Sequence, residues 1–296
     1  MREYIVDFMK SFDYPPEAQA ELLGAYDKLV SDEEGKRGLT GLISLYQTDI
    51  RLGYGEISGY AKEIEHTLGI HRYQGELLVF ICLSKHLKKL YSERKIDESI
   101  WFNGMLDLKY KLLECKAVKN IWGTFVGGWF PGFFKLKRFA LGRLQFEISR
   151  YDRDDYTKDN KTVTRGMTVL DVHIPRTGTR LDADSCDTAF SMAKEFFRDT
   201  VKEAPMAFVC FSWMLYPDII DILPKKSNIR SFASRFEIID RHDDKPQEYA
   251  DMWRVFDMDY TGNVNDYPED SSLRRSLKAY LKSGGKTGEG YGIFFA

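Results

Sequence analysis

The chain has little of what marks several classes of protein. Its 296 residues include only 4 cysteines, and 43 basic and 45 acidic side chains leave a net charge of −2. This near-zero charge gives no global field that would attract nucleic acid or an anionic membrane, so we expect neither as a partner. The cysteines are far apart and form no C-x-x-C pair, which favours a reducing cytoplasm over a disulfide framework.

Long hydrophobic runs are also lacking. The first ten residues carry charges throughout and contain no signal-peptide core. The longest weakly polar run, residues 121–134, is broken by glycine and proline and is too short to span a bilayer. What is present, 43% hydrophobic and 30% charged residues, is typical of a globular protein of about two domains. We therefore expect a soluble, cytoplasmic protein.

Two hydrophobic patterns divide the chain. The first ~120 residues show the spacing of amphipathic helices and no alternating strand. After an aromatic, glycine-rich segment, helical stripes mix with expected strands near residues 140–148, 169–174, 206–215, 236–240, 254–257 and 291–295. The sequence predicts an α+β protein with a helical N-terminal domain, residues 1–125, and a mixed α/β domain, residues 126–296.

The most informative segment is residues 168–201. Apolar side chains alternate from Leu170 to Ile174 on one face of a strand, while Asp171 and His173 lie on the opposite face. Proline ends this strand, because it cannot donate a ladder hydrogen bond. A basic loop with Gly178 and an amphipathic helix follow, an order that places backbone N–H groups where a phosphate can bind.

Three segments carry a resemblance to a known family. They read L-G-R-L-Q-F-E from Leu141, V-L-D-V-H-I-P from Val169 and C-F-S-W-M-L from Cys210. In this order and spacing they resemble the C-terminal domain of GNAT-like acyltransferases, in which an all-helical N-acyltransferase N-terminal domain comes first. The resemblance implies a splayed central sheet, acyl-CoA or acetyl-CoA as co-substrate, and acyl transfer to a small-molecule amine acceptor.

The resemblance also implies where CoA would lie. The pantetheine arm would follow the strand edge at Val172 and Ile174, and the pyrophosphate would lie over the loop of Arg176, Thr177, Gly178, Thr179 and Arg180. That loop reads R-T-G-T-R-L, whereas the superfamily pattern is Q/R-x-x-G-x-G/A. Three aspartates at the start of the next helix compete with a phosphate for its N–H groups. These departures favour an alternative function, a non-catalytic binding or regulatory protein that retains a GNAT-like fold.

Amine acylation needs a base for the ammonium proton and donors for the oxyanion. His173 is one candidate base, and Glu147, in a polar row with Arg143 and Gln145, is the other. Each also has a structural interpretation, as a hydrogen-bonded histidine or as part of a solvated strand face. Asp171 would orient His173 only if the strand bends, so we assign Asp171 a structural role.

Ser212 is a third catalytic candidate. It, or Tyr216, would protonate the departing thiolate, a role that GNAT-like enzymes often give to a hydroxyl group. A hydrolase nucleophile at Ser212 would lack its G-x-S-x-G elbow, and Cys210 lies in an apolar strand where thiols are inert. No metal is predicted, since the one calcium-like loop has Pro268 in place of its bidentate glutamate.

Overall fold

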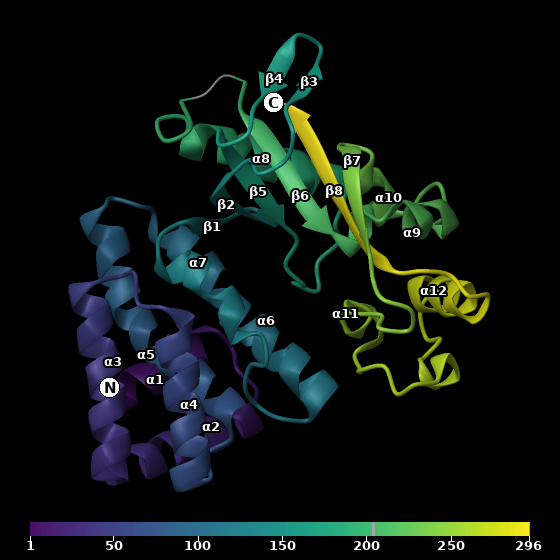
Figure 1. Ribbon diagram of the computed structural model, residues 1–296. Helices are drawn as coiled ribbons and strands as arrows, with labels where there is room; N and C mark the ends of the chain where they lie inside the picture. Colours follow the sequence, from purple (N-terminus) through teal and green to yellow (C-terminus); the bar gives the residue numbers. More distant parts are fainter. Residues whose placement is uncertain (203–204, 296) are drawn as a thin grey trace. The chain divides into compact units, whose positions relative to one another are not determined.

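A computed structural model of the chain describes residues 1–202 and 205–295 (Figure 1). The chain divides into two compact units, Met1–Phe139 and Ala140–Ala296. This division falls later than the 125/126 boundary that we expected. The reason is that the aromatic segment packs within the helical unit, where the Phe80 ring lies 5.0 Å from that of Phe130 and 5.2 Å from that of Phe134.

The first unit is helical, as the periodicity predicted. Buried apolar side chains line several of its helices, and α5 alone buries residues from Leu77 to Leu83 without a break. Helix starts follow local chemistry: proline occupies the first turn of α2, and the Asp97 carboxylate accepts a hydrogen bond from the Ser99 N–H at 2.7 Å to cap α6. The elements are α1 (Arg2–Ser11), α2 (Pro16–Ser31), α3 (Glu33–Thr48), α4 (Tyr54–Leu68), α5 (Arg72–Glu93), α6 (Glu98–Lys119), η1 (Gly127–Trp129) and α7 (Pro131–Phe134).

The second unit is built on a six-stranded sheet in the order β1-β2-β5-β6-β8-β7, with a separate β3-β4 hairpin (Figure 1). β5 and β6 are parallel and joined through α8, and the pairs β2–β5, β6–β8 and β7–β8 are antiparallel. The strands are β1 (Arg138–Leu141), β2 (Leu144–Arg150), β3 (Tyr156–Lys158), β4 (Lys161–Val163), β5 (Thr168–His173), β6 (Ala207–Ser212), β7 (Glu237–Asp243) and β8 (Gly288–Phe295).

One face of this sheet is closed by α8 (Ala183–Phe197). The Phe190 ring of the helix meets the rings of Phe146, Phe208 and Phe294 from three strands at centroid distances of 5.6, 5.1 and 5.0 Å. The three strand residues alternate with residues of the other face, so the strand pattern of the sequence supplies the sheet side of this aromatic core. The opposite face is apolar at one end, where Tyr151 and Val163 cover Val169 and Ile293.

The remaining helices form a second core beside the sheet. Trp213, Tyr216, Ile219 and Leu277 are buried in it, and the Phe256 and Tyr267 rings stack at 3.8 Å. Its elements are η2 (Trp213–Leu215), α9 (Pro217–Ile222), α10 (Asn228–Ala233), α11 (Trp253–Phe256), η3 (Val264–Asp266) and α12 (Ser272–Lys282).

Two strand predictions in this region were wrong. Residues 254–256 belong to the short helix α11, and Asp257 caps its end with a left-handed φ of 58°. The strand expected over 206–215 stops at Ser212, because the Ser212 hydroxyl accepts a hydrogen bond from the Met214 N–H at 3.2 Å and starts η2. β8 passes η2 so closely that a Cβ at Gly290 would lie 2.1 Å from the Leu215 carbonyl oxygen.

The aromatic core predicts a large loss of stability for Phe146→Ala. This substitution should lower the free energy of unfolding by about 3–5 kcal/mol, because it empties a fully buried ring site. Urea denaturation followed by circular dichroism measures the loss. Phe211→Ala is the control, since Phe211 lies in the same sheet but is 40% exposed and should change little. Equal losses for both variants would contradict this account of the core.

Candidate active site

The central feature of the second unit is that β5 and β6 separate. Their parallel ladder contains two residue pairs, Leu170↔Phe208 and Asp171↔Val209. β5 stays paired with β2 as far as His173, and β6 stays paired with β8 as far as Ser212. The backbone of β5 after Asp171 therefore has a strand on one side only, and the sheet is splayed at the carboxyl ends of its two central strands.

A histidine and two carboxylates gather on one face at this point. In the β2–β5 register Glu147 lies opposite Asp171, and His173 is the next residue of β5 on the same face. His173 Nε2 is 3.4 Å from Glu147 Oε2 and 3.8 Å from Asp171 Oδ2. The side chains are partly buried, at 16, 23 and 31% exposure for His173, Glu147 and Asp171. A histidine beside two carboxylates is a group of residues that can take part in proton transfer.

The structure thus brings His173 and Glu147 together and adds Asp171, to which we had given only a structural role. No sharp bend is needed, since side chains two apart on one strand face reach the same imidazole. Ser212 is not part of this group. It alternates with Phe211, which lies on the His173 face, so its side chain projects from the α8 face.

The thiol of Cys210 is also on the α8 face and is fully buried. Burial raises the pKa of this thiol well above its usual range, and the charges of Asp171 and Glu289 add to the effect. A thiol held in its protonated form is a poor nucleophile, which agrees with our sequence-based interpretation.

The expected phosphate loop is held by Arg143. Its guanidinium donates to the carbonyl oxygens of Pro175, Thr179 and Arg180 at 2.9, 3.4 and 3.2 Å. Gly178 has a φ of 76°, a left-handed conformation in which side chains are unfavourable. In the sequence Arg143 belongs to the polar row with Gln145 and Glu147. Only the tertiary structure shows that its guanidinium binds the carbonyl groups of this loop.

Two charges of the loop region are already paired. The Arg176 guanidinium forms a two-point ion pair with the Asp257 carboxylate, which also accepts from Arg274 at 2.5 Å. At the start of α8, Asp182 Oδ1 accepts from the Ser185 N–H at 2.8 Å. This hydrogen bond lowers the pKa of Asp182, so a carboxylate occupies part of the helix terminus, as the sequence predicted.

A pocket of about 490 Å³ lies beside the loop. Arg180 and Lys226 bring positive charge to it, and the first residues of α10 and α12 complete its wall. The resemblance implied phosphate binding by Arg180, whereas nothing in the sequence indicated that Lys226 lies beside it. The other residues of the lining are Leu223, Pro224, Ser227, Asn228, Ile229, Ser272 and Leu273.

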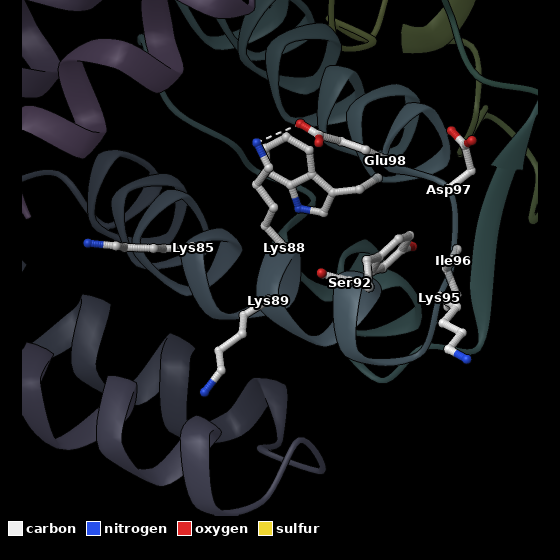
Figure 2. A pocket seen from close by; sticks show the side chains of 10 residues that line it. Lys85, Lys88, Lys89, Ser92, Lys95, Ile96, Asp97 and Glu98 are labelled. Carbon is white, nitrogen blue, oxygen red and sulfur yellow. Dashed lines mark ion pairs between the residues drawn. The ribbon is translucent and has the colours of Figure 1, made fainter.

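The helical unit contains a larger pocket of about 710 Å³ at the turn between α5 and α6 (Figure 2). Four lysines, Lys85, Lys88, Lys89 and Lys95, line it together with Asp97 and Glu98, and the Lys88 ammonium pairs with the Glu98 carboxylate at 2.6 Å. Its charged lining is largely exposed to solvent, and it contains none of the residues that the sequence singled out.

Glu289 is a site residue that the sequence did not reveal. On β8 it lies two residues before Tyr291 and therefore shares its face; Tyr291 pairs with Phe211, so Glu289 extends towards the face that carries His173. Burial raises the pKa of its carboxyl to about 7, with further raising by the charges of Asp251 and Asp244. The signal was the period-2 pattern of β8, which begins at Gly288, whereas we expected a strand only from residue 291.

Val172 and Ile174 differ in position. Val172 is a buried residue of β5 on the α8 face, and Ile174 is half-buried just after the strand ends. Both contribute backbone, not side chains, to the splayed edge.

Within residues 1–202 and 205–295, no group of three or more His, Cys, Asp or Glu side chains is arranged to hold a metal ion. Nor is any helix in those residues long and apolar enough to cross a membrane.

Comparison with family models assigns both units of the chain. Residues 138–294 match the GNAT-like C-terminal domain, and residues 3–136 match the N-acyltransferase N-terminal domain. The chain belongs to the family defined by the GNAT-like C-terminal domain. No match was found among curated protein sequences.

Solved structures share the fold over nearly the whole chain. A crystal structure of an acyltransferase mutant with octanoyl-CoA is 20% identical, with a TM-score of 0.77 over 99% of this chain and 88% of that one. An acyltransferase with decanoyl-CoA and teicoplanin is 20% identical, with a TM-score of 0.74 over 98 and 87%. A third, with CoA and 10C-teicoplanin, is 21% identical, with a TM-score of 0.75 over 98 and 86%.

The role of Arg143 predicts that Arg143→Ala loosens the loop. Amide hydrogen exchange in residues 176–181 should become about tenfold faster or more, because three carbonyl contacts are lost. Arg150→Ala is the matched control on the same strand, since Arg150 bonds to Gly166 and Thr168 at the other end. Unchanged exchange in the loop of Arg143→Ala would disprove the assignment.

The environment of Glu289 predicts a pH-dependent stability. A carboxyl whose pKa is raised to about 7 on folding stays protonated in the native state while the unfolded state ionises. The contribution of the Glu289 carboxyl to the free energy of unfolding is fully present below its ordinary pKa, and it is lost as the pH rises from about 4.5 to 7. Glu289→Gln should therefore stabilise the protein by about 1–2 kcal/mol at pH 8, after allowance for partial exposure, and by nearly nothing at pH 4. Thermal unfolding at both pH values measures this, and an equal effect at both would contradict it.

Proposed function

We propose that this protein transfers an acyl group from acyl-CoA to the nitrogen of a small-molecule amine. The observation that carries the proposal is the splay of β5 and β6, with His173 and Glu147 beside it. The β5 backbone at Val172–Ile174 offers N–H and C=O groups on the side from which β6 has departed. An extended ligand with amide groups, such as pantetheine, can pair with such an edge as an added strand would.

The charges near the loop support a place for the CoA phosphates. Arg143 holds the loop of Arg176, Thr177, Gly178, Thr179 and Arg180 in shape, while Asp257 already neutralises Arg176. We therefore assign the main phosphate contact to Arg180 with Lys226, which line the adjacent pocket. The related structures solved with octanoyl-CoA and decanoyl-CoA support acyl-CoA as the donor.

The chemistry proceeds by direct attack of the amine. The neutral amine nitrogen bonds to the thioester carbon, the C–S bond breaks, and the CoA sulfur leaves as a thiolate. His173 takes the proton that the nitrogen loses, and Glu147 and Asp171 stabilise the imidazolium cation. The imidazolium then returns this proton to the thiolate, so the products are an amide and free CoA thiol. Ser212 is the second candidate donor for that proton.

The acceptor and the setting follow from the same features. Two related structures were solved with teicoplanin or 10C-teicoplanin, which supports a small-molecule acceptor. The carboxylates of Glu147 and Asp171 attract an amine that arrives protonated. It gives up this proton to solvent before its neutral nitrogen attacks the thioester. Four free, buried cysteines favour a reducing cytoplasm as the place of action.

One observation favours a second function, a binding or regulatory protein without catalysis. Asp182 caps α8 and Asp257 holds Arg176, so the protein's own carboxylates already satisfy two groups that would meet a pyrophosphate. A protein of this kind would keep the splayed sheet and bind CoA weakly or not at all. The two functions are separated by binding and turnover measurements on one set of variants.

The first test is thermal unfolding with CoA, acetyl-CoA and acyl-CoAs of increasing chain length. A ligand at a hundred times its dissociation constant adds about 2.7 kcal/mol, and each kcal/mol moves the midpoint by roughly 2–4 °C in a domain of this size. We expect a shift of roughly 5–10 °C with the preferred acyl-CoA and a smaller shift in Arg180→Ala. Absence of a shift with every CoA species would favour the binding-protein alternative.

The second test follows release of free thiol with an amine acceptor. His173→Ala together with Glu147→Ala should reduce turnover by at least about a hundredfold, because the proton acceptor is removed. His66→Ala, in the helical unit, is the control and should keep full activity. Turnover that survives the double substitution would overturn the site assignment while leaving acyl transfer itself intact.

A further inference from the structure

Gln145 is an unusual residue of β2. Its side chain is only 1% exposed, yet its carboxamide oxygen, Oε1, has no hydrogen-bond partner among the described residues. Buried amide groups are almost always hydrogen-bonded, since an unpaired one costs stability. A buried acceptor without a partner points to a partner that arrives during function.

The position of Gln145 identifies that partner. In the β2–β5 register Gln145 lies directly opposite His173, so both side chains project from the same face. Directly opposed residues have Cβ atoms about 4.5–5.5 Å apart, which places a glutamine carboxamide within reach of an imidazole. Glu147, two residues along β2, lies on the same face. Two carboxylates lie near His173 Nε2, and that of Glu147 is the nearer.

We propose that Gln145 is a positioning residue whose carboxamide oxygen accepts a hydrogen bond from the His173 imidazole when that ring carries a proton. A neutral imidazole has one N–H, whereas the cation has two, so protonation creates the donor that the Gln145 oxygen lacks. This role of Gln145 rests on the proposed function, because it requires that His173 acts as the base. Gln145 itself is buried and acts on the reaction through His173.

The charged and titratable groups around His173 are known from each neighbouring strand. β2 contributes Glu147, and β5 contributes Asp171. β8 contributes Glu289 and Tyr291, and burial together with the Asp171 charge raises the pKa of Tyr291. β6 presents Phe211 on this face and holds Cys210 on the other. All of these groups remain in a Gln145 variant. Their contributions therefore cancel when the variant is compared with the natural protein at each pH.

The first test needs no activity. Gln145→Leu removes the unpaired amide and should raise the unfolding midpoint at pH 8 by about 3–6 °C. At pH 5.5 a proton on His173 should supply the hydrogen-bond donor that Gln145 lacks in the natural protein. The advantage of Gln145→Leu should then shrink by at least half or reverse. Glu147 and Asp171 stabilise the cation in both proteins, and only the natural protein has the carboxamide as a further acceptor, so the sign of the difference between them is fixed.

His173→Ala supplies the control background. In that background Gln145→Leu should raise the midpoint equally at pH 8 and pH 5.5, because the titrating donor is gone. A pH-independent advantage in the presence of His173 would overturn the proposal. Destabilisation by Gln145→Leu at both pH values would also overturn it, because it would show that the carboxamide is bonded in the resting protein.

The second test uses turnover. Gln145→Leu should lower kcat about tenfold while the KM values for acyl-CoA and amine stay within about twofold, because Gln145 acts on the imidazolium and not on substrate binding. In the His173→Ala background it should cause no further loss. Gln145→Glu, which keeps an acceptor oxygen, should restore most of the rate. If the protein shows no acyl transfer at all, the proposed function fails, and the stability measurements still decide the role of Gln145.

Discussion

The candidate site depends on the early end of the β5–β6 ladder. A parallel pair joined through a helix normally extends along both strands, but here it stops after two residue pairs. β8 keeps β6 in place on one side and β2 keeps β5 in place on the other, so the separation falls in the middle of the sheet. A strand edge that no neighbouring strand faces can accept another extended segment alongside it. This geometry makes the fold suitable for an extended, amide-containing ligand.

Charge around the splay is largely balanced within the protein. Arg143 is used by loop carbonyls, Arg176 by Asp257, and the start of α8 by Asp182. These contacts give the loop a defined shape without a ligand. On the other side, His173 lies between two carboxylates, so it can change its charge without leaving an isolated ion in a partly buried place. In the proposed function the loop region would bind the CoA phosphates and His173 would transfer the proton.

Alternation along single strands predicted much of this. It placed Asp171 and His173 on one face and put Glu147 in a polar row, and the register then brought these side chains together. The pattern failed where local hydrogen bonds compete with strand pairing, as at Ser212, and where a short helix follows an irregular turn, as at residues 253–256. Arg143 and Gln145 belonged to the same predicted polar row. Nothing in the sequence indicated that Arg143 would bind the carbonyl groups of the loop or that Gln145 would be a buried amide without a partner.

The sequence by itself determined the helical and mixed halves, the strand faces and the residue types available for acyl transfer, because these depend on periodicity within short segments. The tertiary structure alone decided which faces meet. Strand register set the 3.4 Å approach of His173 to Glu147, and the fold of the second unit brought Asp257 to Arg176 and Lys226 to the pocket of Arg180. Such contacts join residues far apart in the chain, and their geometry follows from the packing of whole elements, which no local pattern encodes.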